Sequence, residues 1–124
     1  MIFATREDRK KGNFMQGIHL RFYTYENRKH DSMLQYEWLL EYAKKLGIHG
    51  GSAFRAIAGY GRHGRLHEQH FFELAGEVPV LVEFIVSPAE SDTLLAALSK
   101  ESVHLFYARL ATEFDTIGLQ AGSR

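Results

Sequence analysis

The segment spanning residues 78–86 limits what this chain can fold into more than any other. Apart from Glu83 it is almost wholly apolar, and a short apolar run of this kind is typical of a strand at the centre of a sheet. It falls well short of the about 20 apolar residues that cross a bilayer. The chain is therefore expected to build a sheet around this strand, with no direct membrane insertion.

Three further strands are predicted from the pattern of side chains. Apolar and polar residues alternate over 18–25 and again over 103–110, as a half-buried strand requires. Residues 52–58 follow two glycines and carry mostly small side chains, which indicates a short strand that neighbouring backbone can approach closely. Four strands are expected in all.

Two helices are predicted from capping signals. Ser32 and Gln35 have the spacing of a capping box that opens a helix running to about Leu46, and Gly47 follows where a left-handed C-cap residue is wanted. Residues 87–90 supply an N-cap serine, a first-turn proline and a capping-box glutamate for the second helix. The first helix is expected to bury a stripe made of Tyr36, Leu39, Leu40, Ala43 and Leu46.

The resulting order, βαββαβ, predicts an α+β ferredoxin-like sandwich with two helices on one face of a four-stranded antiparallel sheet. Residues 1–16 are expected to form a flexible N-terminal arm, 17–115 the domain and 116–124 a loose C-terminal tail. The sheet face away from the helices would expose a large apolar and aromatic area, which favours self-association. Its residues are His19, Tyr23, Tyr25, Leu81, Ile85, Phe106 and Leu110.

Composition narrows the classes of partner. Fifteen basic residues balance fifteen acidic ones, so no overall field attracts nucleic acid, and no nucleic-acid partner is expected. The chain has no cysteine, which removes disulfides, thiolate metal sites and cysteine nucleophiles and fits a reducing, cytoplasmic location.

Residues 55–61, R-A-I-A-G-Y-G, resemble the R-G-I-x-G-F-G signature of the PII-like proteins of domain-of-unknown-function family 190, with Ala56 in place of glycine and Tyr60 in place of phenylalanine. Glu26 and residues 48–52 and 65–67 also match the family pattern. The resemblance implies a regulatory homotrimer that binds a small effector between subunits. It also implies contact with a target protein, a transporter or an enzyme, through the loop at 59–72.

The likeness to PII proteins implies that the effector is an adenine nucleotide, and arginines beside glycine amides suit phosphate. Arg62 and Arg65 could equally be solvated loop charges. AMP or ADP is expected rather than ATP, because residues 99–102 hold no glycine-rich basic stretch for a third phosphate. The predicted ligand-binding residues are Arg55, Gly59, Tyr60, Gly61, Arg62, Arg65 and His67.

Two other functions stay open at the level of sequence. His63, His67 and His70 have a spacing that could bring imidazoles together on a metal ion, so a histidine-based metal-binding trimer is the alternative hypothesis. A small cofactor-free oxygenase of similar topology is the third, with His19 and Glu83 meeting at a subunit interface. No catalytic set can be read from the sequence, and no cofactor is expected to be required.

Overall fold

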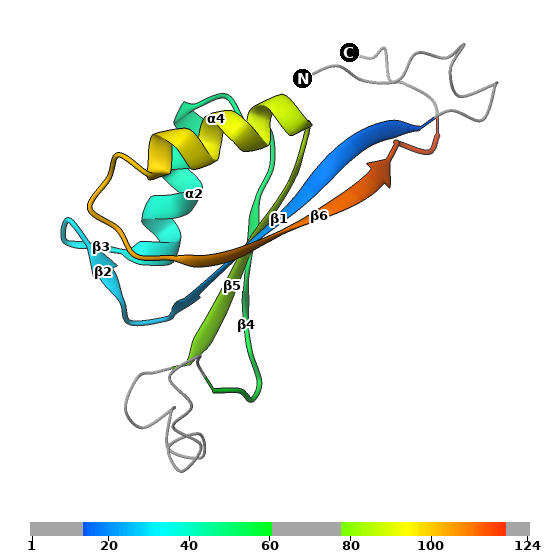
Figure 1. Ribbon diagram of the computed structural model, residues 1–124. Helices are drawn as coiled ribbons and strands as arrows, with labels where there is room; N and C mark the ends of the chain where they lie inside the picture. The colour runs from blue at the N-terminus through cyan, green and yellow to red at the C-terminus, as the bar shows by residue number, and fades with distance from the viewer. Residues whose placement is uncertain (1–13, 61–77, 119–124) are drawn as a thin grey trace.

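Two helices cover one face of a four-stranded antiparallel sheet in the computed structural model, which describes residues 14–60 and 78–118 (Figure 1). The sheet order is β4-β5-β1-β6, and its strands are β1 (Met15–Tyr25), β4 (Ser52–Arg55), β5 (Pro79–Val86) and β6 (Phe106–Phe114). The helices are α2 (Gln35–Lys45) and α4 (Pro88–Leu98), and a small hairpin of β2 (Lys29–His30) and β3 (Met33–Leu34) precedes α2. The predicted α+β ferredoxin-like fold is confirmed.

The core lies between the helices and the two central strands. Leu20 of β1 pairs with Phe84 of β5, and Phe22 pairs with Val82. All four side chains are buried, as alternation on the helix-facing side requires. Leu39 of α2 and Leu94 of α4 complete this core from the helix layer. Full burial of such a side chain stabilises the fold by about 1.5–3 kcal/mol.

Neither helix, nor any other helix in residues 14–60 and 78–118, is long and apolar enough to span a membrane.

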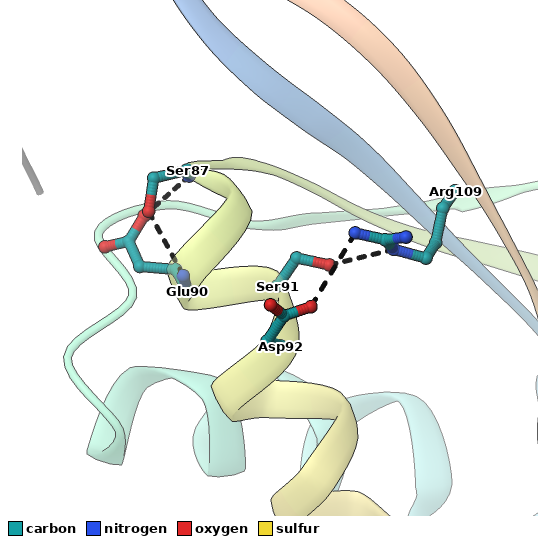
Figure 2. Close-up of polar contacts among 5 residues, drawn as sticks. All are labelled: Ser87, Glu90, Ser91, Asp92 and Arg109. Atoms are coloured by element: carbon teal, nitrogen blue, oxygen red, sulfur yellow. Dashed lines mark hydrogen bonds and ion pairs between the residues drawn. The ribbon is translucent and has the colours of Figure 1, made fainter.

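The start of α4 has the predicted capping box (Figure 2). The Glu90 backbone N–H donates to the Ser87 hydroxyl at 3.1 Å, and the Ser87 backbone N–H donates to the Glu90 carboxylate at 2.9 Å. From β6, Arg109 Nε donates to the buried Ser91 hydroxyl at 3.2 Å, and Arg109 Nη2 lies 3.8 Å from the Asp92 carboxylate. These contacts tie the edge strand β6 to the first turns of α4.

The predicted start of the first helix is wrong. Asp31 and Ser32 have positive φ angles of 52° and 69°, and they form the two-residue turn of the β2–β3 hairpin, where positive φ at both central positions matches the strand twist. The N-cap is Leu34, without a side-chain cap bond. Gln35 is buried and accepts a hydrogen bond from the Thr24 hydroxyl instead. The end of the helix is as predicted, with Gly47 at φ 91°.

Three predicted strand limits and one core position also differ. β1 begins at Met15, so residues 15–16 belong to the sheet and not to the arm. β4 ends at Arg55, not at residue 58. The Ala56 backbone N–H still donates to the Pro79 carbonyl at 2.9 Å, but Pro79, where β5 begins, has no backbone N–H to return a bond. β6 spans 106–114 instead of 103–110, in register with β1 from Tyr23 back to Met15. Leu46, expected in the core, lies past the last turn of α2 and is exposed.

Candidate functional site

A pocket of about 950 Å³ lies at one end of the sheet. The register brings Tyr25 opposite Pro79 and Tyr23 opposite Phe106, so β1 ends here where β5 and β6 begin. β4 ends at the same place, and Gly59, which follows it, lines the pocket. The volume lies in the range of pockets that hold small molecules and cofactors.

One wall of the pocket is a row of apolar side chains on the sheet face away from the helices. Phe54, Leu81, Tyr23 and Phe106 are successive register partners across β4, β5, β1 and β6, and all four line the pocket. The three aromatic side chains are 37–51% exposed, and the Tyr23 and Phe106 ring centroids are 5.4 Å apart. Such a row offers a planar ring a surface on which to stack.

The polar part of the pocket is cationic. Arg21, Arg28 and Arg55 line it, and no described lining residue is an aspartate or a glutamate. Arg28 belongs to the turn after β1, where its backbone N–H donates to the Tyr25 carbonyl at 3.2 Å. Its guanidinium carbon lies 5.1 Å from the Tyr25 ring centroid. Cations that face a partly apolar pocket attract an anionic ligand.

Arg55 is held by a carboxylate just outside the pocket lining. Its Nη2 donates to the Glu26 carboxylate, and Glu26 is itself fixed by its backbone N–H, which donates to the Val78 carbonyl at 2.8 Å. The hydrogen bond and then the charge of Glu26 raise the pKa of Arg55 above its ordinary value, so Arg55 stays cationic. A guanidinium has five N–H donors in a fixed fork, so Arg55 can keep Glu26 and still bind an anion.

The structure places part of the predicted ligand set in this pocket. Arg55, Gly59 and Tyr60 line it, and their binding of a ligand stays a prediction. Arg21 and Arg28 also line the pocket and were not predicted, since only the register brings β1 and its turn beside the end of β4. The alternation of residues 18–25 puts Arg21 on the sheet face away from the helices, but alternation by itself does not indicate a binding site. The other predicted ligand residues, Gly61, Arg62, Arg65 and His67, lie outside the described residues.

The same sheet face continues away from the pocket. His19 pairs in register with Ile85 on one side and Leu110 on the other, and both apolar side chains are exposed, as predicted. His19 Nε2 lies 2.9 Å from the Glu83 carboxylate. The two residues therefore meet within one chain, across β1 and β5. The oxygenase hypothesis placed them at a subunit interface, and that part of it stays a prediction.

The metal hypothesis concerns residues of which the structure says nothing. His63, His67 and His70 all fall in the segment 61–77, outside the described residues. Among residues 14–60 and 78–118, no three His, Asp or Glu side chains are grouped so that they could hold a metal ion. The three-histidine site stays a prediction.

A family profile described as DUF190, Uncharacterized ACR, matches residues 17–104. The chain belongs to this family. A UPF0166 protein of Aquifex aeolicus is 41% identical to this chain over 66 residues, which make up 53% of this chain and 63% of that relative. The chain thus spans less than two thirds of the length of this relative.

Two solved structures have the same fold as this chain. One is a protein of Thermus thermophilus described as PII-like and signalling, with a TM-score of 0.57, 16% identity, and coverage of 82% of this chain and 92% of that chain. The other is CPII, a nitrogen regulatory PII-like protein of Thiomonas intermedia bound to ADP, AMP and bicarbonate. Its TM-score is 0.58 at 12% identity, and the match covers 85% of this chain and 99% of that chain. At such identities the likeness is one of fold.

Proposed function

We propose that this protein is a PII-like regulatory module that binds an adenine nucleotide, AMP or ADP, in the pocket at the end of the sheet. The observation that carries the proposal is the lining of this pocket, three guanidinium groups beside a row of aromatic side chains. A nucleotide has both chemistries, a planar base and an anionic phosphate. The ADP and AMP bound to CPII, which shares the fold, support the choice of nucleotide.

The proposed pose follows from the aromatic row and from the arginines of the pocket. The base stacks on the exposed row of Phe54, Tyr23 and Phe106, and the phosphates lie between Arg28 and Arg55. Gly59, which lines the pocket, lets the backbone approach the phosphates closely. Residues 61–67 follow directly in the chain, and we keep Gly61, Arg62, Arg65 and His67 in the proposed ligand set.

A mono- or diphosphate fits better than a triphosphate. The segment between α4 and β6 carries Lys100 next to Glu101 and no glycine, so it offers no basic cradle for a third phosphate. The Glu101 carboxylate is occupied, since the Tyr42 hydroxyl donates to it at 3.0 Å. A third phosphate would find a single lysine on this segment, next to a carboxylate, and not the several basic groups and glycine amides of a phosphate cradle.

The proposed assembly is a homotrimer joined through the sheet face away from the helices. Besides the aromatic row, this face keeps Ile85 and Leu110 exposed two rows further along, and exposed apolar area of this kind marks an interface in small proteins. Because the row also lines the pocket, the nucleotide would lie at the edge of the interface between subunits. The loop at 59–72 would then contact a target protein, and the module would act by binding and not by catalysis.

Titration calorimetry with AMP, ADP and ATP tests the nucleotide proposal. Wild type should bind AMP or ADP, and Arg28→Ala or Arg55→Ala should each weaken binding about 10- to 100-fold, because each removes a charge-assisted hydrogen bond of about 1.5–3 kcal/mol. Lys45→Ala, which removes an exposed cation at the end of α2, is the control and should bind like wild type. If wild type gives no heat with any of the three nucleotides but responds to zinc, the histidine hypothesis replaces this one.

A further inference from the structure

The sheet face away from the helices carries one cation among apolar rows. Arg21 of β1 lies in the row between the aromatic row of Tyr23 and the row of His19, and its register partners are Glu83 on β5 and Ala108 on β6. A cross-strand glutamate is the natural partner of an arginine in this position. The expected ion pair between Arg21 and Glu83 would neutralise the charge.

Arg21 does not make that ion pair. The Glu83 carboxylate instead lies 2.9 Å from His19 Nε2. The guanidinium carbon of Arg21 lies 5.8 Å from the Tyr23 ring centroid. Its Nε is buried and has no hydrogen-bond partner. Among the described residues, no aspartate or glutamate forms a salt bridge with Arg21.

A buried N–H donor without an acceptor is costly, and a charged one more so. An oxyanion would satisfy the donor, because the fork of a guanidinium matches two oxygens of a carboxylate or a phosphate. Arg21 also lines the pocket at the end of the sheet, together with Tyr23 and Leu81. These apolar neighbours lower the local dielectric and strengthen an ionic contact.

We propose that Arg21 holds a compact oxyanion, a phosphate or carboxylate group, at this point of the pocket. The oxyanion is either a free anion or the phosphate of the nucleotide proposed above, and in the second case that phosphate would lie at Arg21 and not between Arg28 and Arg55. In a subunit assembly it would neutralise a charge that the interface would otherwise bury without a partner. The site extends beyond the proposed function, since a free anion can bind here whether or not a nucleotide does.

The experiment measures binding of inorganic phosphate, acetate and AMP in an oxyanion-free chloride buffer, by calorimetry and by thermal shift. Arg21→Met keeps the length of the side chain and removes its donors, and Arg21→Lys keeps the charge without the fork. Arg109→Met removes a guanidinium on the opposite face of the same sheet, which Ser91 and Asp92 engage, and is the control.

Phosphate or acetate should raise the melting temperature of wild type and of the control. Arg21→Met should lose about 10- to 100-fold in affinity and melt no lower than wild type without anion, since it removes an unsatisfied donor. Arg21→Lys should regain part of the affinity. If Arg21→Met loses affinity for AMP but not for phosphate or acetate, the oxyanion is the phosphate of the nucleotide. If it loses affinity for phosphate or acetate, the oxyanion is a free anion.

Unchanged affinity for all three probes in Arg21→Met would overturn the inference. A change of association state in Arg21→Met without any change in anion binding would also overturn it, because the partner of Arg21 would then be a carboxylate of another subunit. Binding of phosphate through Arg21 with no binding of AMP to wild type would instead refute the nucleotide proposal and leave this one standing.

Discussion

Removing two apolar side chains from the exposed sheet face should dissociate the proposed trimer. Ile85 and Leu110 flank His19 and are 48% and 44% exposed in the single chain. Full burial of such a side chain contributes about 1.5–3 kcal/mol, so covering the exposed half of each contributes about 1 kcal/mol. Ile85→Ala with Leu110→Ala should therefore cost about 2 kcal/mol per subunit, which is on the order of 10⁴-fold in the dissociation constant of a trimer.

Light scattering at a series of micromolar concentrations measures this effect directly. Wild type should have about three times the 14.2 kDa mass of one chain, and the double variant should approach one chain at low concentration. A matched double variant, Leu46→Ala with Ile117→Ala, removes exposed side chains of the same two types away from this face. Equal dissociation of both double variants, or a monomeric wild type, would refute the assignment of the interface.

Two further predictions concern stability and are checked by chemical denaturation. Ser87→Ala should lower the free energy of unfolding by about 1 kcal/mol, since it removes the cap of α4, whereas Ser102→Ala, at an exposed position, should leave it unchanged. Gly51→Ala should cost about 1–3 kcal/mol, because the added Cβ would lie 2.4 Å from the buried Phe84 ring. Gly50→Ala meets no atom within 4 Å and should cost little, and equal losses at the two glycines would contradict the packing argument.

Local patterns in the sequence were enough to predict the fold. Alternation placed residues 20 and 22 in the core, the apolar run 78–86 is the central strand β5, and the spacing of Ser87 and Glu90 set the start of α4. The same kind of spacing failed at Ser32, because a two-residue hairpin turn and a helix cap favour the same polar residues. The contact of Gln35 with Thr24 depends on tertiary packing that spacing cannot report.

The candidate site was less predictable, because it depends on which strand ends meet. Arg55 could be singled out from its family motif, but Arg21 and Arg28 join it only through the order β4-β5-β1-β6. Likewise, Glu83 has two neighbours across the strands, Arg21 and His19, and it contacts His19. A single sequence does not contain the register that decides such a choice.

The most direct test of the nucleotide proposal is to map ADP binding by the amide chemical shifts of the isotope-labelled protein. The proposal predicts that the largest shifts on addition of ADP occur at residues 23–28 and 54–60, which surround the pocket. The amides of Leu94 and Leu98, buried on the helix side, should stay unchanged and serve as the internal control. Saturable shifts confined to the pocket residues are the predicted result, and no shifts with ADP, or shifts centred on α2 and α4, would contradict it.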